Sequence, residues 1–551
     1  MRSLPLGRPL AVRGSWCGPK SRLTSYRTIE SAHHLTTTTA PAGPVPAEKG
    51  LPYKWKAFWV IGISLFTMVM DFSITNIALP SIAKDFGLTL RVVSWVSIAG
   101  ALTITAVLLP MGRLADIAGR KTIQLTGIVL FCAATLLAVF APNLPVLIAA
   151  RMIMALGAAM IQAVGTAMVL SVFPQEERGK GLGMITTVVG IGSVAGPIIG
   201  GPLVEAFGWR SVYLFLFVPN LIGFFFAWRV LDDALVGTVK RRSGDSYDWP
   251  GAGTSAIFFV LAIFTISNPL DLSWTSGVLA AGGVLAAALF VFFVWWELRV
   301  KAPMLSLRFF KNSQFTWTTA TRFIAFLGGT ASWFLMPFFV QDILGYTART
   351  VGFVLFFNAF GLASAAFFSG RLSDRLGSKK FVIAGLVLGM AANAAFITLS
   401  TDTPVWLVAS ILLLNGIGMG TWNAPNTSMT LGAVDRSSYG IVGAFVNLVR
   451  NIANVTGTAM ITAIVAGVMV SRGVPADLGA IAESGDPAGA NAFVAGMRVV
   501  YVMQVALLGL ALIAAMFSRE PERAHAKDAH SARVGKTAPD SVPSPAGTGA
   551  R

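Results

Sequence analysis

Long apolar runs are the feature that most limits what this chain can fold into. About fourteen of them lie between residues 57 and 517, each close to 20 residues long, with short turn-rich connectors between them. In a bilayer every backbone N–H and C=O group needs a partner inside its own segment, so such runs must be helical. Only 12% of the residues are charged, whereas a soluble protein has about 25%. We therefore expect an all-α polytopic membrane protein with about 14 transmembrane helices.

The basic residues of the connectors predict how the chain is oriented. Most of them lie in the even-numbered connectors, which include Arg120, Lys121, Arg375 and Lys379. Lys and Arg are enriched in cytoplasmic loops, so these connectors and both basic tails are expected in the cytoplasm. The net charge of +17 is thus assigned to membrane orientation and not to nucleic-acid binding. We expect a multi-pass protein of the plasma (inner) membrane with both termini inside.

The same pattern divides the chain into domains. Residues 1–54 and 518–551 are polar and are expected to be disordered cytosolic tails. Between them we expect an N-terminal six-helix half at 55–231, a linker with extra helices 7 and 8 at 232–312, and a C-terminal six-helix half at 313–517.

A ten-residue segment occurs twice and supports this division. Residues 112–121 read GRLADIAGRK and residues 370–379 read GRLSDRLGSK, so six of the ten positions are identical. Many secondary transporters are assembled from internal repeats. The copies follow spans 2 and 10, which predicts two pseudo-symmetric six-helix halves with a peripheral helix pair inserted between them.

At these residues the chain resembles the major facilitator superfamily and, within it, the fourteen-span drug:proton antiporter branch. The resemblance covers roughly residues 55–517 and implies gating loops at Gly112, Asp116, Gly119 and Arg120 and at Gly370, Asp374, Arg375 and Gly377. The family usually has a basic residue where Ile117 stands. A carboxylate at the end of span 2 opposes its own helix dipole, so Asp116 needs a basic partner or another helix to cap. Such a contact can break between two packings; the alternative is a plain topology anchor.

Span 5 carries a glycine pattern that fits the antiporter motif of the same family. Its fixed positions are Gly183, Gly192, Gly196, Pro197, Gly200 and Gly201. Gly192, Gly196 and Gly200 recur every four residues and form a smooth face that another helix can approach closely. Pro197 removes a backbone hydrogen bond and is expected to bend the span. The resemblance connects this motif with export by antiport; the alternative is ordinary helix packing.

Span 1 contains the one acidic residue that lies deep in a span, Asp71. An intramembrane carboxylate is costly and usually functional, and burial favours its protonated form. We expect Asp71 to take up and release the coupling proton, with Arg151 of span 4 adjusting its proton affinity. The alternatives are a static carboxylate–Arg pair and a helix-packing role for Arg151.

Polar stripes on several spans predict the wall of a central cavity. The candidates are Thr75, Asn76, Gln162, Arg322, Met419, Trp422, Asn426, Asn447 and Arg450. If two or more of Arg151, Arg322 and Arg450 face the cavity, its field is positive whenever Asp71 is protonated. That field predicts a preference for neutral, zwitterionic or anionic amphiphiles; the alternative is that the Arg side chains bind backbone carbonyls outside the cavity.

These features favour a secondary active transporter that exports amphipathic small molecules or drugs in exchange for protons by alternating access. The alternatives are a proton-coupled symporter or uniporter of a small metabolite and a non-transporting membrane sensor. An enzyme, a metal site and a cofactor are not expected, because all four His residues lie in the tails, Cys17 and Cys132 have no Cys-x-x-Cys partner, and no phosphate-binding loop is present. The expected partners are a small-molecule substrate, protons and the lipid bilayer, and the resemblance implies a functional monomer.

Overall fold

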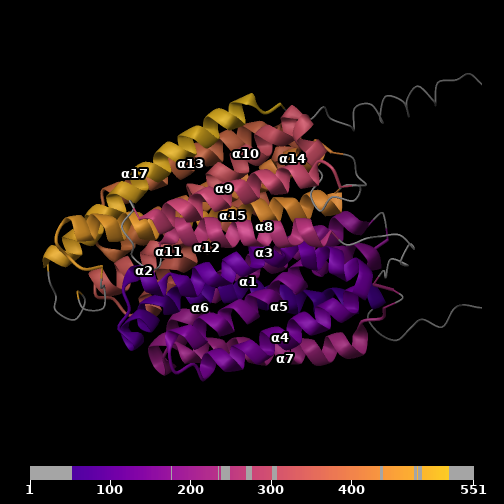
Figure 1. The fold of residues 1–551 in the computed structure, drawn as a ribbon, viewed down its shortest axis with the longest axis horizontal. Helices are drawn as coiled ribbons and strands as arrows, with labels where there is room; N and C mark the ends of the chain where they lie inside the picture. The colour runs from indigo at the N-terminus through magenta and orange to yellow at the C-terminus, as the bar shows by residue number, and fades with distance from the viewer. Residues whose placement is uncertain are drawn as a thin grey trace, which may run out of the picture. The chain divides into compact units, whose positions relative to one another are not determined.

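The computed structural model describes residues 52–174, 177–233, 235–236, 248–268, 276–300, 307–434, 439–476, 481 and 487–519. For a few residues within helices, among them Asp116 and Asp374, only the backbone is described. The expected tails thus lie almost wholly outside the described residues. Fourteen described helices are long and apolar enough to cross a membrane, and the described part contains no strand. The prediction of an all-α protein with about 14 spans is confirmed (Figure 1).

Six long helices and one short helix form the first group. They are α1 (Tyr53–Phe86), α2 (Leu90–Val93), α3 (Trp95–Ala118), α4 (Arg120–Val139), α5 (Leu144–Val172), α6 (Arg178–Phe207) and α7 (Arg210–Val230). Local signals set several ends: the Asn143 side chain accepts a hydrogen bond from the Val146 amide at the start of α5. Gly87 ends α1 with a φ of 61°, in the left-handed region that favours glycine.

The last group contains six spans, one of which is interrupted. Its elements are η2 (Leu307–Lys311), α10 (Ser313–Leu327), α11 (Ala331–Phe338), η3 (Phe339–Ile343), α12 (Ala348–Leu376), α13 (Ser378–Ile397), α14 (Val405–Gly432), α15 (Tyr439–Ser471) and α17 (Pro487–Phe517). Span 9 consists of α10, α11 and the single π-helical turn η3. It is broken at Gly328-Gly329-Thr330, because two successive glycines weaken a helix.

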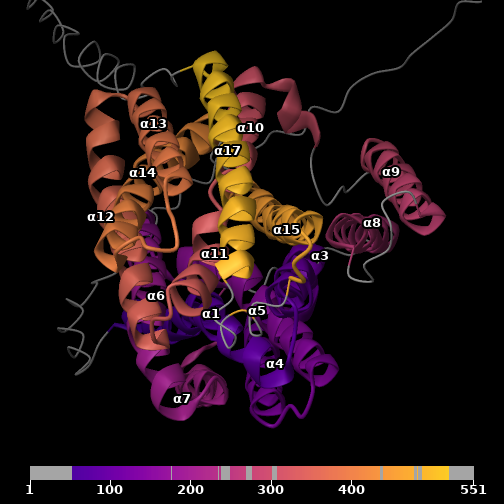
Figure 2. The same ribbon diagram turned by 90° about the vertical axis from the view of Figure 1, so that its left-hand side faces the viewer.

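Helices α8 (Trp249–Ser267) and α9 (Gly277–Glu297) are the peripheral pair. The Asp248 side chain caps α8 by accepting from the Gly251 amide, and it also accepts from Trp296 Nε1 at 2.8 Å, which ties the pair together. Helix α8 contacts both α3 and α15, whereas α9 packs mainly on α8. Figure 2 shows the pair at one side of the helices that surround α1.

The two six-helix groups meet along two seams. Helix α6 packs along α12, and α3 packs along α15. Helix α1 lies between these seams and contacts α5, α6, α7, α11 and α12. A change at α1 can therefore reach both groups.

Candidate functional site: a buried ion pair beside a central pocket

Asp71 lies halfway along α1 and forms a buried ion pair with Arg151 of α5. Arg151 Nη1 donates to Asp71 Oδ1 at 2.7 Å, and the two side chains are 6% and 12% exposed. The Thr75 hydroxyl donates to the same oxygen at 3.3 Å. Arg151 Nε donates to the carbonyl of Val96 in α3 at 3.3 Å. The structure thus joins two predicted residues that are 80 positions apart in the chain.

Through Arg151, the Asp71 carboxylate helps to hold three helices together: α1, α3 and α5. Removing one partner of a buried ion pair costs about 3–5 kcal/mol, because the other charge is left uncompensated. A proton on Asp71 removes that partner's charge without removing its atoms. Protonation would therefore weaken the link between α1 and α5 and leave Arg151 in need of another acceptor.

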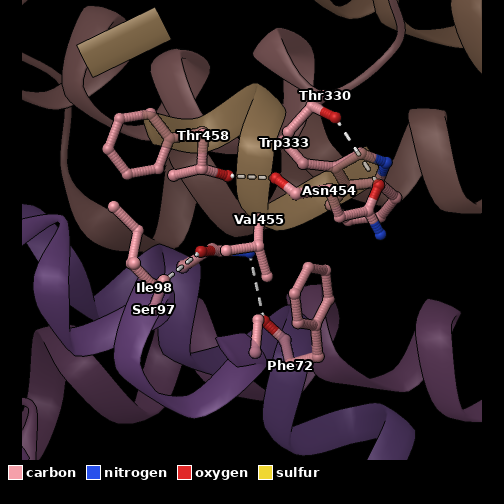
Figure 3. Close-up of a pocket in the computed structure, with 11 residues that line it drawn as sticks. Phe72, Ser97, Ile98, Thr330, Trp333, Asn454, Val455 and Thr458 are labelled. Carbon is pink, nitrogen blue, oxygen red and sulfur yellow. Dashed lines mark hydrogen bonds between the residues drawn. The ribbon is translucent and has the colours of Figure 1, made fainter. Parts of the chain in front are cut away.

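A small pocket lies between the two six-helix groups, and its wall includes Phe72 and Asn76, the chain neighbours of Asp71 and Thr75, but neither member of the ion pair. Phe72, Asn76 and Ser97 line it from α1 and α3, and Thr330, Trp333, Asn454 and Thr458 are among the residues that line it from the last group. In Figure 3 the purple helices below and the orange-brown helices above supply these two sets.

Hydrogen bonds hold the polar residues of each wall. Ser97 Oγ donates to Asn76 Oδ1 at 3.1 Å, and Thr330 Oγ1 donates to Asn454 Oδ1 at 3.5 Å. Phe72 is the chain neighbour of Asp71, so the ion pair and the pocket lie at the same level of α1 but on different faces of the helix.

The glycine motif of span 5 forms close contacts with two helices. A Cβ atom on Gly192 would lie 3.0 Å from the carbonyl oxygen of Phe66 in α1, and one on Gly196 would lie 2.7 Å from Ser73 Cβ. On another face, a Cβ on Gly201 would lie 2.7 Å from the carbonyl oxygen of Ala348 in α12. The close approach expected at Gly192, Gly196 and Gly200 is present, and its partner is α1.

Two members of that motif have different surroundings. Gly183 has open space where a Cβ would lie. Helix α6 continues through Pro197, and the carbonyl of Pro197 faces Gly352 of α12. The motif therefore packs α6 against α1 within one group and against α12 of the other.

The duplicated loops have the same backbone geometry. Helix α3 ends at Gly119 with φ 96° and ψ 136°, and α12 ends at Gly377 with φ 100° and ψ 131°. A side chain is strained at such a φ, which explains why both copies keep glycine there. Arg120 Nη1 lies 3.5 Å from the carbonyl oxygens of Ala167 and Val236. The side chains of Asp116 and Asp374 lie outside the described residues, so their gating role stays a prediction, as it does for Gly112, Gly370 and Arg375.

The predicted cavity residues lie in several places. Of the nine candidates only Asn76 lines the described pocket. Trp422 is 3% exposed and packs edge-to-face on Phe326 at 5.1 Å, in a cluster with Val382 and Leu386 of α13. Asn426 Nδ2 donates to the carbonyl of Thr318 in α10 at 3.1 Å. Trp422 and Asn426 thus serve helix contacts in this structure.

The other candidates are buried or half-buried around the same region. Gln162 is half-buried on α5, and Met419 packs partly buried against the cluster that contains Trp422. Asn447 donates to the carbonyl of Gly443 one turn earlier on α15.

Several residues at the site were not expected from the sequence. The pocket is also lined by Phe72, Ser97, Thr330 and Thr458. Of these only Thr458 could have been predicted, because it lies one helical turn beyond Asn454 on the polar face of α15.

A polar network and a second acid were also missed. Asn415 Oδ1 accepts from Ser332 and from Asn358, which links α11, α12 and α14. Asp342 lies half-buried in η3, and the positive charge of Lys84 attracts its carboxylate.

Comparison with known proteins identifies the family. The model of the Major Facilitator Superfamily matches residues 61–458. The riboflavin transporter RibZ of Clostridioides difficile (strain 630) is 29% identical over 406 residues, which cover 74% of this chain and 87% of that protein. The multidrug transporter protein MdtP of Bacillus subtilis (strain 168) is 26% identical over 404 residues, 73% of each chain.

A solved structure supports the fold. The crystal structure of a bacterial homolog to the human lysosomal transporter Spinster, inward-facing and unoccupied, aligns with a TM-score of 0.61 at 16% identity. The alignment covers 85% of this chain and 98% of that one. With the family match over most of the chain and fourteen candidate spans, this protein belongs to the major facilitator superfamily, as a multi-pass membrane transporter that fits its fourteen-span drug branch.

Proposed function

We propose that this protein exports amphipathic small molecules in exchange for protons by alternating access. It acts as a monomer in the plasma membrane with both termini in the cytoplasm. The observation that carries the proposal is the buried Asp71–Arg151 ion pair, which lies on α1 at the same level as a pocket between the two helix groups. The multidrug transporter MdtP among the relatives supports export of drug-like molecules.

Coupling in this proposal runs through α1. A proton that reaches Asp71 releases Arg151, and α1 can then shift against α5. Helix α6 follows, because its glycines pack directly on α1 and a neighbouring face packs on α12. Entry of one proton supplies about 2.3 kcal/mol per 100 mV of membrane potential and about 1.4 kcal/mol per pH unit, which is enough for uphill export.

The test uses the purified full-length protein in proteoliposomes with an imposed pH gradient. Uptake into proteoliposomes, by the protein molecules whose cytoplasmic side faces outward, is followed for three fluorescent amphiphiles: one cationic, one neutral and one anionic. Wild-type protein should accumulate at least one of them, and a protonophore should abolish the accumulation. Asp71→Asn should abolish uphill transport while the protein stays folded.

A matched control is available on the same helix. Asp85 lies at the end of α1, is partly exposed, and accepts from Arg210 Nη1 at 2.8 Å. An exposed ion pair contributes about 0–1 kcal/mol, so Asp85→Asn should transport like the wild type. Full proton-driven accumulation by Asp71→Asn would contradict the coupling assignment.

Uptake of a small metabolite with protons is the second candidate, and its specific support is the similarity to the riboflavin transporter RibZ. The same liposomes decide between the two. Export predicts that substrate and protons move in opposite directions, so an inward substrate gradient should drive protons outward and acidify the exterior. Alkalinisation of the exterior on adding riboflavin would favour the uptake reading.

A further inference from the structure

The positive charges at membrane depth are not equivalent. Arg151 is neutralised by Asp71 at 2.7 Å. Arg498, near the start of α17, directs Nη2 to the carbonyl of Leu399 at 3.0 Å. Arg322 of α10 and Arg450 of α15 remain, and both belong to the last helix group.

Arg322 is held in one orientation. It is 4% exposed, Nε donates to the carbonyl of Val446 in α15 at 3.2 Å, and Nη1 donates to Thr427 Oγ1 of α14 at 2.8 Å. Its guanidinium also lies 5.1 Å from the centre of the Phe326 ring. Thr427 in turn donates to the carbonyl of Asn423, so backbone, hydroxyl and ring fix the guanidinium among three helices.

Arg450 adds a second charge to the same place. It follows Val446 by one turn on α15, is half-buried, and its charge acts on Arg322. Neither guanidinium forms an ion pair with a carboxylate within the described ranges. One buried donor on α15, Asn451 Nδ2, also lacks a hydrogen-bond partner.

Two like charges at low exposure are unfavourable unless an anion accompanies them. A buried charge is costly without a partner, and planar guanidinium groups suit the two oxygens of a carboxylate or sulfonate. The guanidinium of Arg322 already lies on one apolar ring, Phe326, and Met419 is only partly buried at the edge of the same cluster, so apolar groups stand next to the charges. The region therefore matches a molecule with one anionic group and one apolar part.

We propose that Arg322 and Arg450 form an anion-binding subsite that takes the carboxylate or sulfonate of an amphipathic substrate. This subsite would give the protein a preference for organic anions over neutral analogues of the same shape. The polar stripe of α15 continues from Arg450 through Asn454 to Thr458, and the last two line the pocket. Arg450 therefore stands one helical turn from a residue that lines the pocket, and in this proposal the substrate spans both. That the bound anion is then transported rests on the proposed function. That it binds at Arg322 and Arg450 does not.

The test compares a charged probe with its neutral twin. The purified full-length protein is placed in phosphatidylcholine nanodiscs, and equilibrium binding of 7-diethylaminocoumarin-3-carboxylate and of its ethyl ester is measured by fluorescence. Hydrogen bonds to charged groups predict that the carboxylate binds about tenfold more tightly than the ester. Arg450→Gln should raise the Kd of the carboxylate about tenfold and leave that of the ester unchanged.

Controls separate charge from folding. Arg450→Lys keeps the charge and should keep most of the preference, and Arg322→Gln should act like Arg450→Gln if it remains folded. Arg498→Gln removes the same charge elsewhere and should bind both probes like the wild type. Equal binding of acid and ester by the wild-type protein overturns the proposal, whatever the variants do.

Three further outcomes distinguish the subsite, a bound lipid and the export function. Loss of the preference when phosphatidylglycerol is added would show that a lipid headgroup occupies the subsite, which also overturns the proposal. Selective binding of the carboxylate without proton-driven transport would uphold the subsite and refute the export function. Proton-driven transport of acid and ester alike, with no dependence on Arg450, would uphold export and refute the subsite.

Discussion

The seam between α6 and α12 is closed by glycines, and the substitution Gly201→Ala probes it. The added Cβ would lie 2.7 Å from the carbonyl oxygen of Ala348 and 3.1 Å from the Cα atoms of Arg349 and Gly352. All three are backbone positions of α12, so no flexible side chain can move aside. The two helices must separate by several tenths of an ångström at this end, which is the predicted outer end.

The cost sets the size of the expected shift. Overpacking of a close contact costs about 1–3 kcal/mol. If the closed outer end bears that cost and an open state does not, the equilibrium moves toward the open state by roughly 5- to 150-fold. The substitution should therefore expose the pocket to the outside without unfolding either helix group.

Spin labels measure the shift directly. Cysteines replace Phe207 at the end of α6, which is 75% exposed, and Tyr346 before α12, which is 39% exposed, in a background where Cys17 and Cys132 are serine. Electron–electron distance measurements should show a larger long-distance population for Gly201→Ala than for the parent. The ratio of the long-distance to the short-distance population should rise by the roughly 5- to 150-fold expected for the open state.

The control is Gly183→Ala in the same helix, where a Cβ meets nothing within 4 Å. Each substitution improves helix propensity by up to about 1 kcal/mol. The two variants therefore differ only in the contact that the new methyl group makes with α12. Identical distance distributions for the two variants would refute the reasoning that the seam holds this end closed.

Other predictions follow from the same contacts. Gly196→Leu or Pro197→Leu should lower the transport rate by at least about tenfold with little change in expression, because bulk there separates α6 from its neighbours; rates normalised to membrane protein check it. Asp116→Asn should slow the cycle more than it weakens substrate binding, and Asp374→Asn should be milder, since the second loop has Ser where the first has Arg; paired rate and Kd measurements decide. Glu205 accepts from the Thr347 hydroxyl at 3.0 Å and from the Arg349 amide at 3.2 Å; a Gln side chain can still accept there, so Glu205→Gln should open the outer end less than Gly201→Ala in the same spin-label assay.

The span count could be predicted because it depends on local properties. A run of 20 apolar residues must form a helix in lipid whatever surrounds it. For the same reason, Asp71 could be recognised from its position alone. Span 9 was harder, because its interruption at Gly328 and Gly329 lies inside an apolar run and changes no overall pattern.

Contacts between spans could not be predicted in the same way. Helical periodicity tells which residues share a face, but not which helix meets that face. Gly201 and Gly196 stand in one motif, yet one packs on α12 and the other on α1. Trp422 lies on a polar stripe, yet its ring packs against Phe326 and away from the pocket.

Helix α8 makes the two seams unequal toward the surrounding lipid. Its Ile263 joins Ile98 and Leu102 of α3 with Val455 and Ala459 of α15 in one apolar cluster, so this seam is covered along part of its length. In the described part of the chain no inserted helix covers α6 and α12 in the same way (Figure 2). A molecule that arrives sideways from the acyl chains would meet a shielded flank at α3–α15 and a bare one at α6–α12. Helix α8 thus gives the protein one partly shielded and one unshielded flank toward the acyl chains.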